Sequence, residues 1–581
     1  MCLFWILCFG ICHSSFAQEG DLEFNLDVKA STYTLPKIFK PNIDLGGRGA
    51  SRKDGWPQNL AAPEALEKWQ QDIGFSGIYR LQYNLWEIQE AAKDKERQEK
   101  LLSNYEAIFK KITDSGGVII LDIFGMPAGL GRVLDKISAP RNLKALKAFI
   151  KSSIRTLSCD KKYNIWYEVW SAPDREDFFL GRKQDYLNLY RSVAEIVQEL
   201  QLENKVHIPL GGPSSSWWFQ SDGLNTVITP EKSLIYSLVK FCYRYRLPLD
   251  FITWHSYSSD PQVDKEVTIY KKSGIALIRD WLSYFRFDRG TSLIISEWNY
   301  DSAANMLPER QEKSNVCASY IFSRLKNMYE AGLDYQVYFS LEDFQSAQEG
   351  MSRNVGIFSF DAEAPEYKGA AKATYNALRM LAGLGNNMFA QPLKQSDEFV
   401  GVISTRFGED ITIIIYNYID PAIGRNYISR NISTLNSAAR KILLRLAKSD
   451  RLDKIIRAEL DITAMRMDKK LKALLKKAQE LNIQAQKYIS SPRNIKVNIN
   501  NLKDEYRYQR YKIDSSCVLD CEFLPLEEKD IAAADSYQEI LALNPYSVNM
   551  IVLKKKPPEA EPEIAAEEQK PEPQPAASTA N

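Results

Sequence analysis

The sequence has little histidine, almost no excess charge of either sign and no long apolar run. Only 3 histidines occur in 581 residues, which leaves little for His-rich coordination, so we expect no metal and no cofactor. Lys and Arg number 75 and Asp and Glu 74, giving a formal net charge of +1. Such a chain has no global field that would attract nucleic acid or an acidic membrane. We therefore expect a neutral partner and no nucleic acid.

The apolar run at residues 3–11 is much shorter than the about 20 residues needed to cross a bilayer, so we expect no membrane span. Small residues at Ser15 and Ala17 follow it and fit a signal peptidase site. We predict that residues 1–17 are a signal peptide and that the protein is secreted or periplasmic. Of the 8 cysteines, Cys517 and Cys521 could close a small disulfide loop in an oxidising compartment, or they could be buried thiols.

The length suggests about two to four domains, and 45% hydrophobic with 26% charged residues is typical of a globular protein. From residue 35 to residue 385, short apolar runs alternate with longer amphipathic stretches, as in βα units around a parallel sheet. This pattern predicts an α/β fold, a (β/α)8 TIM barrel whose site lies at the C-terminal ends of its strands. Strands are expected at 77–81, 118–122, 165–170, 207–210, 251–254, 293–296 and 336–339, and helices at 64–71, 105–115, 143–157, 186–202, 233–245 and 315–331.

After residue 385 the pattern changes to short β runs, at 399–403, 411–416, 495–499 and 547–553. A Lys- and Leu-rich stretch interrupts them between about residues 433 and 490, with apolar residues at helical spacing. We predict a β-sandwich accessory domain over residues 386–553, with a helical insertion at about 433–490. Residues 554–581 are rich in Pro, Glu and Ala, which predicts a disordered tail.

Two of the predicted barrel strands end in polar residues. The string L-I-I-S-E-W-N (293–299) is an apolar strand that delivers the carboxylate of Glu297 at its end. An unpaired charge loses a large hydration energy there, so its presence indicates either a function or a structural bond to a loop. The string W-Y-E-V-W-S-A-P-D (166–174) has the same form of a strand followed by a polar turn.

The second string resembles F-E-V-W-N-E-P-N, the fourth-strand motif of glycoside hydrolase family 39, a family of clan A barrels that includes β-xylosidases and α-L-iduronidases. I-S-E-W-N (295–299) is similar to the nucleophile strand of that family, T-E-W-N. The resemblance covers about residues 35–385, and L-N-P-Y-S-V (543–548) looks like part of the family's accessory sandwich. Other segments agree in order: G-F-S-G-I-Y-R (74–80), F-G-M-P (124–127), G-G-P (211–213), W-H-S-Y (254–257) and Y-F-S-L-E-D-F (338–344).

The resemblance implies retaining hydrolysis by two carboxylates, with Glu297 at the position of the nucleophile. The acid/base should be the Glu of N-E-P, but this chain has Ser171 and Ala172 before the proline. Ala172 cannot transfer a proton, and Ser171 lacks the amide that the family Asn would offer to the sugar 2-hydroxyl. Glu168 matches the first Glu of F-E-V-W, where we expect it to support the site rather than to reach the glycosidic oxygen.

Three replacements for the missing acid are conceivable. A neighbouring acid, Asp174, Glu176 or Asp177, could swing in; Asp343 could serve from another strand; or the substrate could have a leaving group that needs no proton. The point matters because general acid catalysis commonly contributes about 10²- to 10⁴-fold.

The remaining expected site residues come from positions that match the family segments. Trp170 and Trp298 could stack on a sugar or could cap the barrel core, and Arg80 is expected to support Glu297 as an ion-pair partner. The residues expected to bind substrate are Trp170, Ser171, His255, Tyr257, Trp298, Asn299, Tyr338 and Asp343, with Arg80 and Glu168 supporting.

Three functions follow from these residues. The first is a secreted glycosidase acting on β-linked glycosides or polysaccharide, with Glu297 as nucleophile and the acid/base lost. The second is an inactive, carbohydrate-binding pseudo-enzyme that uses the same cleft. The third is a cell-surface assembly protein that uses the helical insertion and the tail. Carbohydrate is the expected partner in the first two.

Overall fold

The structure is a computed structural model that describes most of the chain. It covers residues 22–47, 55–219, 229–268, 270–287, 290–301, 314–345, 352–353, 355–359, 369–463 and 465–557. The predicted signal peptide at 1–17 and nearly all of the predicted tail lie outside these ranges. No helix within them is long and apolar enough to cross a membrane.

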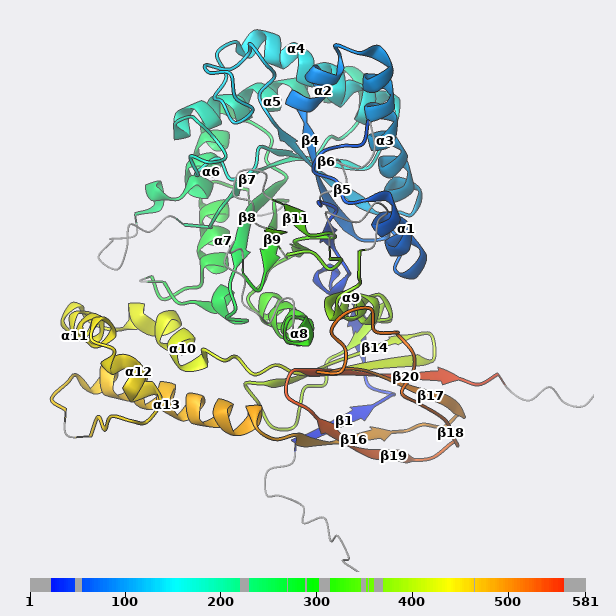
Figure 1. The fold of residues 1–581 in the computed structure, drawn as a ribbon, viewed down its shortest axis with the longest axis vertical. Coiled ribbons are helices and arrows are strands. Elements are labelled where there is room, and N and C mark those ends of the chain that lie inside the picture. The colour runs from blue at the N-terminus through cyan, green and yellow to red at the C-terminus, as the bar shows by residue number, and fades with distance from the viewer. Residues whose placement is uncertain are drawn as a thin grey trace, which may run out of the picture.

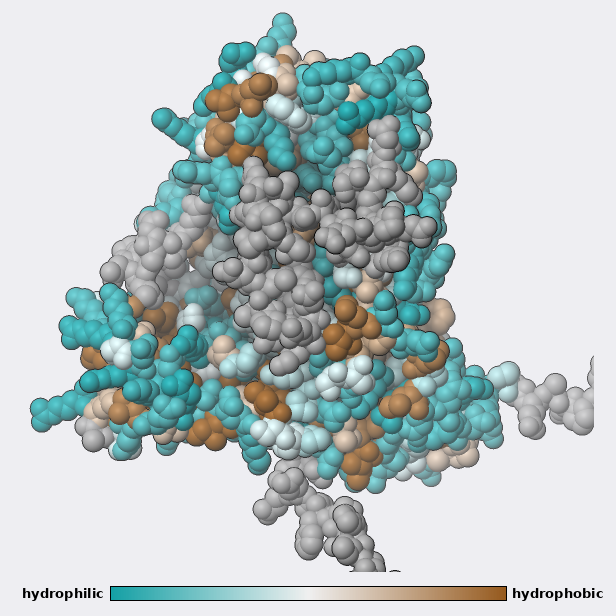
Figure 2. Space-filling view, in the orientation of Figure 1, coloured by the Kyte–Doolittle hydropathy of each residue, from teal (hydrophilic) through white to brown (hydrophobic). Residues whose placement is uncertain are grey.

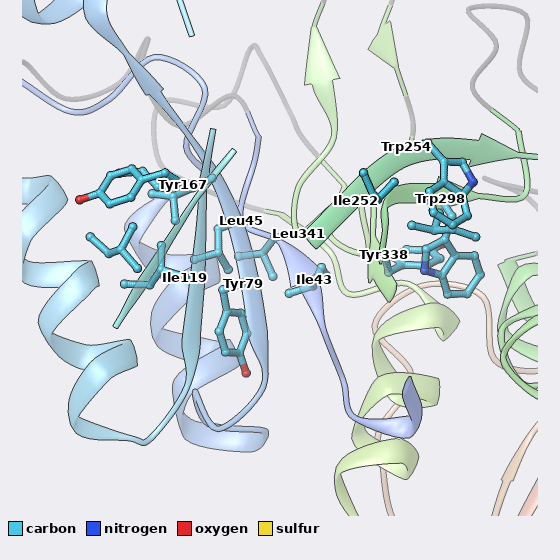
Figure 3. Close-up of a cluster of buried hydrophobic side chains, with 14 of the residues drawn as sticks. Ile43, Leu45, Tyr79, Ile119, Tyr167, Ile252, Trp254, Trp298, Tyr338 and Leu341 are labelled. Atoms are coloured by element: carbon cyan, nitrogen blue, oxygen red, sulfur yellow. The ribbon is translucent and has the colours of Figure 1, made fainter. Parts of the chain in front are cut away.

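Eight parallel strands close into a barrel in the order β10-β3-β4-β5-β6-β7-β8-β9 (Figure 1). Their cores are buried apolar residues, and Figure 3 shows part of the packing, with Tyr79 beside Ile43 and Leu45. The strands are β3 (Ile43–Asp44), β4 (Ile78–Asn84), β5 (Val118–Phe124), β6 (Ile165–Val169), β7 (Leu210–Ser215), β8 (Phe251–Tyr257), β9 (Ser292–Asn299) and β10 (Tyr335–Tyr338). A parallel barrel of this kind brings the C-terminal ends of all its strands to one rim.

Helices surround the barrel and connect its strands (Figure 1). Several begin at a polar cap: the Asn142 side chain accepts from the N–H of Ala145, and Ser233 accepts from the N–H of Tyr236. The helices are α1 (Pro63–Asp72), α2 (Leu85–Ala91), α3 (Lys95–Asp114), α4 (Leu143–Ile154), α5 (Lys183–Asn204), α6 (Leu234–Tyr245), α7 (Gly274–Tyr284), α8 (Ser314–Glu330) and α9 (Ala373–Ala382). A short hairpin, β11 (Phe344–Gln345) and β12 (Ser352–Arg353), follows the last barrel strand.

Two sheets pack beside the barrel as a β-sandwich (Figure 1). One sheet has the order β1-β16-β19, formed by β1 (Leu22–Asp27), β16 (Arg493–Asn500) and β19 (Ser536–Leu543). The other has the order β18-β17-β20-β15-β14-β13-β2, formed by β18 (Glu527–Ile531), β17 (Tyr506–Ile513), β20 (Ser547–Lys555), β15 (Asp410–Asn417), β14 (Val400–Phe407), β13 (Asn387–Phe389) and β2 (Thr32–Thr34). Both N-terminal strands, β1 and β2, thus belong to the sandwich, although the barrel follows them in the chain.

Four helices are inserted between β15 and β16 and have a hydrophobic core of their own. They are α10 (Ile423–Asn431), α11 (Ser437–Lys448), α12 (Arg451–Ile456) and α13 (Lys469–Ile489). The Asp468 carboxylate caps α13 by accepting from the N–H groups of Lys470 and Leu471. Leu471, Leu475 and other residues at helical spacing fill this core.

The predicted TIM barrel and accessory β-sandwich are confirmed. The sequence patterns did not reveal β3, α7, β1 or β2, and they placed the strand at 207–210 before the observed β7. The first inserted helix, α10, begins at Ile423, before the expected start near residue 433. Cys517 and Cys521 form a disulfide, whereas Cys159, Cys242 and Cys317 are buried thiols.

Candidate active site

Glu297 lies near the C-terminal end of β9, and its side chain is 12% exposed. Its Oε1 accepts a hydrogen bond from Arg80 Nη1 at 2.7 Å. Its Oε2 accepts one from the Tyr257 hydroxyl at 2.8 Å and lies 3.3 Å from His255 Nδ1. Strands β4, β8 and β9 therefore bring three side chains to one carboxylate, and both of its oxygens are held.

Arg80 is the centre of a larger buried cluster of acids. Besides Glu297, its guanidinium contacts Asp44 at 2.9 Å, Glu168 at 2.7 Å and Asp122 at 3.4 Å. All these groups are almost fully removed from solvent. A single guanidinium cannot neutralise four carboxylates, and an uncompensated buried charge is costly. Some of the four acids must therefore hold protons at neutral pH.

Burial decides which acids are protonated. It raises the pKa of Asp44 to about 7, with the charge of Arg80 opposing the rise and that of Glu297 adding to it. It also raises the pKa of Asp122 well above its ordinary value, again against Arg80, and the neighbouring Glu168 adds to the rise. Burial therefore favours the protonated form of Asp122, and Asp44 is close to its midpoint at pH 7.

The pKa of Glu297 is shifted in the opposite direction, below its ordinary value. Burial alone would raise its pKa, but the positive charges of His255 and Arg80 and the hydrogen bonds from Tyr257 and Arg80 outweigh burial, so the pKa is lowered. Burial lowers the pKa of His255, so its attraction fades at neutral pH while that of Arg80 persists. Glu297 is therefore an ionised carboxylate at neutral pH, as a nucleophile must be.

A hydrogen-bond chain orients His255. Its Nε2 lies 2.9 Å from the Ser214 hydroxyl, while its Nδ1 faces Glu297. In the neutral ring one nitrogen donates and the other accepts. This arrangement assigns the proton to Nδ1, where it can be donated to the carboxylate, and lets Nε2 accept from Ser214.

The turn after β6 has an unusual backbone. Trp170 has φ 68° and Ala172 has φ 43°, both in the left-handed region that side-chain-bearing residues rarely occupy. The turn directs the Ser171 hydroxyl to Arg80 Nη2 at 3.3 Å, and the Ala172 N–H donates to the Ser214 carbonyl at 2.8 Å. Strained backbone of this kind concentrates at functional sites. Here it brings Ser171 to Arg80 and buries Ala172, which is 2% exposed.

The match to a family model decides the identity of the chain. The model of glycosyl hydrolases family 39 matches residues 138–460, more than half of the chain. The chain belongs to this family. The matched residues include β9 with Glu297, β8 with His255 and Tyr257, and the turn that holds Ala172.

Two curated relatives are β-xylosidases. One, from Caldicellulosiruptor saccharolyticus, is 23% identical over 251 residues, which are 39% of this chain and 47% of the relative. The other, from Geobacillus stearothermophilus, is 24% identical over 264 residues, 44% of this chain and 47% of the relative. The chain spans about half the length of the curated relatives it matches.

Solved structures share the whole architecture at low identity. A glucosidase from Croceicoccus marinus has a TM-score of 0.62 at 14% identity and covers 92% of this chain and 100% of its own. A family 39 enzyme from Xanthomonas axonopodis pv. citri has a TM-score of 0.61 at 13% identity, with 94% and 100% covered. A monomeric β-xylosidase from Caulobacter crescentus has a TM-score of 0.59 at 14% identity, with 92% and 99% covered. These likenesses establish the fold.

Of the three acids on the β6 turn that could replace a family 39 acid/base, Asp174 and Asp177 are engaged by other residues. Asp174 accepts from the Ser216 N–H at 2.9 Å and from its hydroxyl at 2.6 Å. Asp177 pairs with Arg175 at 2.6 Å at the surface, where Glu176 is also exposed. Among these three, only Asp174 acts on the pKa of His255, where it opposes the lowering by burial. Asp174 is therefore the strongest candidate on the β6 turn.

Asp343, the candidate from another strand, is bound in a separate ion pair. Its carboxylate contacts Lys372 Nζ at 2.8 Å and accepts from the Gly356 N–H at 2.8 Å. Both charged side chains are buried. This arrangement ties the loop after β10 to the start of α9 and does not bring Asp343 to Glu297.

The predicted sugar-stacking tryptophans are placed in the core. The Trp170 indole donates to the Phe178 carbonyl at 3.0 Å and packs on Phe124 and Phe179. Trp298 follows Glu297 and faces the opposite side of the strand, where its indole donates to Gln336 at 2.6 Å. Both are at most 2% exposed. The structure thus places them as supports of the site's walls.

Asn299 and Tyr338 form a second buried link. The Tyr338 hydroxyl donates to Asn299 Oδ1 at 3.0 Å, and the Asn299 amide donates to the carbonyls of Phe339 and Val355. Figure 3 shows Tyr338 against Trp298, with ring centres 5.0 Å apart. Of the predicted substrate-binding residues, His255, Tyr257 and Ser171 therefore gather around Glu297 and Arg80, while the others support the strand ends.

Three site residues were missed by the sequence analysis: Asp44, Asp122 and Ser214. Asp44 ends β3, and Asp122 lies two residues before the end of β5, as Glu297 does in β9, so carboxylates near strand ends were the available signal. Ser214 follows the G-G-P segment and has φ 53°. No local sequence pattern predicts this conformation. No group of three or more His, Cys, Asp or Glu side chains able to hold a metal occurs in the part of the chain that the structure describes.

Proposed function

We propose that this protein is a retaining glycosidase whose nucleophile is Glu297 and whose family acid/base position is occupied by Ala172. The observation that carries the proposal is the geometry of Glu297, an ionised carboxylate held by Arg80 and Tyr257 at the rim of a family 39 barrel. A retaining nucleophile attacks the anomeric carbon and forms a covalent glycosyl-enzyme while the leaving group departs. Arg80 and Tyr257 fix the carboxylate for that attack.

The absence of a general acid determines which leaving groups the substrate can have. Without a proton donor, the aglycone must leave as an anion, so glycosides with acidic aglycones should react best. The curated relatives are named β-xylosidases, so β-xylosides are the first glycosides to test. The second step also lacks its base, because the acid/base of a retaining enzyme normally activates the water. The glycosyl-enzyme should therefore accumulate.

Asp174 is the acid of the same turn whose charge acts on His255, and it is the first candidate to supply a proton. Its carboxylate would have to leave Ser216 and turn toward the space beside Ala172. If it does so, Asp174→Asn will reduce turnover of poor leaving groups and leave activated substrates unchanged.

A second candidate function is carbohydrate binding without turnover. It is favoured by the engagement of Asp174 with Ser216 and of Asp343 with Lys372, since both carboxylates are then occupied by other residues. Binding on a glycan array with no hydrolysis of any activated glycoside would support this function over the first.

Hydrolysis of dinitrophenyl β-xyloside, with and without azide, separates the two functions. We expect wild type to turn over slowly and azide to accelerate it, because azide needs no base to attack and is small enough to use the volume by which alanine is smaller than glutamate. Ala172→Glu should accelerate hydrolysis and abolish the azide effect. The matched variant Ala172→Gln has the size of the glutamate but no acidic proton, so it should not accelerate hydrolysis. Glu297→Gln should be inactive throughout. Silence of both wild type and Ala172→Glu would contradict the proposed hydrolysis.

A further inference from the structure

The helical insertion has a charge very different from that of the chain. Residues 423–489 carry 16 Lys and Arg and only 6 Asp and Glu, an excess of 10 positive charges, whereas the whole chain has an excess of 1. The rest of the protein is therefore acidic. A local excess of this size creates a positive potential that the overall net charge conceals.

Most of these cations are exposed and outside any ion pair of the described residues. Within the described residues, the insertion's cations form three ion pairs with carboxylates: Arg425 with Asp453, Arg430 with Asp260 and Arg457 with Glu459. The exposed cations outside these pairs are Lys441, Arg445 and Lys448 on α11, Arg451 and Lys454 on α12, Arg466 before α13, and Lys469, Lys470, Lys476, Lys477 and Lys487 on α13. Spacings of four and three residues place the three on α11 along one face of that helix.

The insertion is anchored to the rim of the barrel. Buried Arg430 of α10 pairs with Asp260, and its carbonyl accepts from the Val267 N–H at 3.3 Å. Asp260 and Val267 belong to the loop after β8, the strand whose His255 and Tyr257 contact Glu297. Figure 1 shows α10–α13 (yellow to orange) together at one end of the sandwich, and Figure 2 shows largely hydrophilic surface there. The basic helices thus adjoin the loop that follows β8, the strand whose side chains contact Glu297.

A pocket of about 660 Å³ opens within the insertion. Its lining comes from α10, α12, α13 and the adjoining loops and includes Arg425, Arg457, Asn482, Ile483 and Gln486. Asn482 is 8% exposed, and it belongs to the lining of this pocket. An amide offers both a donor and an acceptor, so a ligand with hydroxyl groups in this pocket would find a partner in Asn482.

We propose that the helical insertion binds an acidic polysaccharide, with one sugar unit in the pocket at Asn482 and the chain along the lysines of α13. This inference rests on the proposed function, because it names the substrate class whose chain would run from the insertion toward the barrel. The paired Arg and acid side chains and the amides of the pocket suit sugar hydroxyls, and the unpaired lysines suit uronate carboxylates.

The lining of the pocket favours a polysaccharide over other polyanions. None of its residues is aromatic, whereas single-stranded nucleic acid binding relies on stacked bases. The only large apolar side chain of α10–α13 that is markedly exposed is Ile483, at 51%, whereas membrane-surface helices bury a broad apolar face. DNA and anionic vesicles are therefore the competing probes in the test.

The test measures binding of the full-length protein to polygalacturonate and to neutral linear xylan. We expect polygalacturonate to bind more tightly, with an affinity that falls as salt rises, because salt screens exposed charges. Changing Lys469, Lys470, Lys476 and Lys477 together to Gln should weaken this binding about tenfold at low salt. The matched control removes four charges from the sandwich, changing Lys503, Lys529, Lys555 and Lys556 to Gln, and should have little effect.

A separate variant tests the role of the pocket. Asn482→Leu should weaken binding of a short oligogalacturonate without changing the salt dependence, whereas Gln484→Leu, an exposed change on the same helix, should not. Helical content and thermal unfolding of each variant show that it is folded. The inference is overturned if the lysine variant and the sandwich control bind polygalacturonate equally. It is also overturned if DNA or phosphatidylglycerol vesicles bind more tightly than polygalacturonate.

Hydrolysis and polygalacturonate binding distinguish failure of the glycosidase from failure of the acidic ligand. Hydrolysis of dinitrophenyl β-xyloside depends on Glu297 and not on the insertion. Lost hydrolysis with intact polygalacturonate binding would overturn only the glycosidase, and intact hydrolysis with no preference for polygalacturonate would overturn only the acidic ligand.

Discussion

Arg80 has the most partners of the site residues, because it contacts Glu297 and three further acids. Arg80→Lys keeps the charge but cannot reach all of them, since an ammonium lacks the planar fork of a guanidinium. We expect the variant to lose about 10- to 100-fold of kcat/KM on dinitrophenyl β-xyloside. The acidic limb of its pH profile should also move to higher pH as Glu297 loses its partner. An unchanged limb would show that Arg80 does not set the ionisation of Glu297.

The Tyr257 hydroxyl should lower the pKa of Glu297 and contribute little to the stability of the fold. Burial, and then the charge of Glu297, raises the pKa of Tyr257 well above its ordinary value, so the phenol remains a donor throughout the working range. Tyr257→Phe removes one hydrogen bond from Oε2, so the pKa of Glu297 should rise. We expect the acidic limb of kcat/KM to shift upward by a fraction of a pH unit, with little change in thermal stability. Ser256→Ala, on the same strand, should leave the limb in place.

Asp44 should make stability depend on pH. Its folded pKa of about 7 lies above the ordinary value of 3.8, so its contribution to stability is fully present below about pH 3.8 and is lost as pH rises through 7. Asp44→Asn mimics the protonated acid and removes this dependence. The free energy of unfolding of wild type relative to the variant should fall by a few kcal/mol at most between these limits, since one pKa unit is worth about 1.4 kcal/mol. A constant difference across this range would contradict the shift.

The residues around Glu297 could be predicted only in part. Arg80, His255 and Tyr257 were found because each belongs to a segment that resembles the family, and the structure gathers them on one carboxylate. Asp44 and Asp122 lie in the same cluster but outside any quoted segment. Their roles depend on sharing Arg80 across the barrel, a relation that no local pattern contains.

At the scale of elements, long periodic segments were predictable and short or non-local ones were not. The strand β3 has only two residues, Ile43 and Asp44, too few for any period to show. The start of β7 reads as a turn because it contains Gly-Gly-Pro. Gly211 is nevertheless part of the strand, where a Cβ would lie 2.3 Å from the Phe251 ring. Strand β1 is defined by pairing of Leu22 with Ile495, far along the chain.

The insertion should unfold as a unit of its own. Leu475 is fully buried in the core formed by α10–α13, which is distinct from the cores of the barrel and the sandwich. Leu475→Ala should cost about 2–5 kcal/mol through the cavity it leaves. We expect faster amide hydrogen exchange confined to residues 423–489, with hydrolysis by Glu297 unaffected. The exposed neighbour Lys476→Ala is the control, and faster exchange throughout the barrel would argue against an independent unit.

At the scale of the whole molecule, the sandwich and the barrel share one core. The largest hydrophobic cluster joins barrel residues to Ile414 and Tyr416 of β15 and Val548 of β20. The Tyr418 hydroxyl also donates to the Ser259 carbonyl in the loop after β8, at 2.8 Å. The accessory module is therefore part of the frame that holds the site's loops, and the basic insertion extends from it beside the same loop.

The overall net charge of +1 led to the expectation of a neutral partner. The net charge of +1 is the sum of a strongly basic insertion and an acidic remainder, so it is the charge of neither part. The segregation follows from the fold, because the inserted helices keep their apolar faces inward and present lysines outward. Whole-chain charge was therefore a poor guide to what the surface of the insertion could bind.

Glu297 should form a covalent bond to the sugar although Ala172 provides no acid. Intact-mass spectrometry of the protein after brief exposure to dinitrophenyl β-xyloside, followed by peptide mapping, tests it most directly. We predict an increase of one pentosyl unit, located on the peptide that contains Glu297 and absent from Glu297→Gln. Dinitrophenol released in a burst without any mass increase, or an increase that persists in Glu297→Gln, would contradict the account.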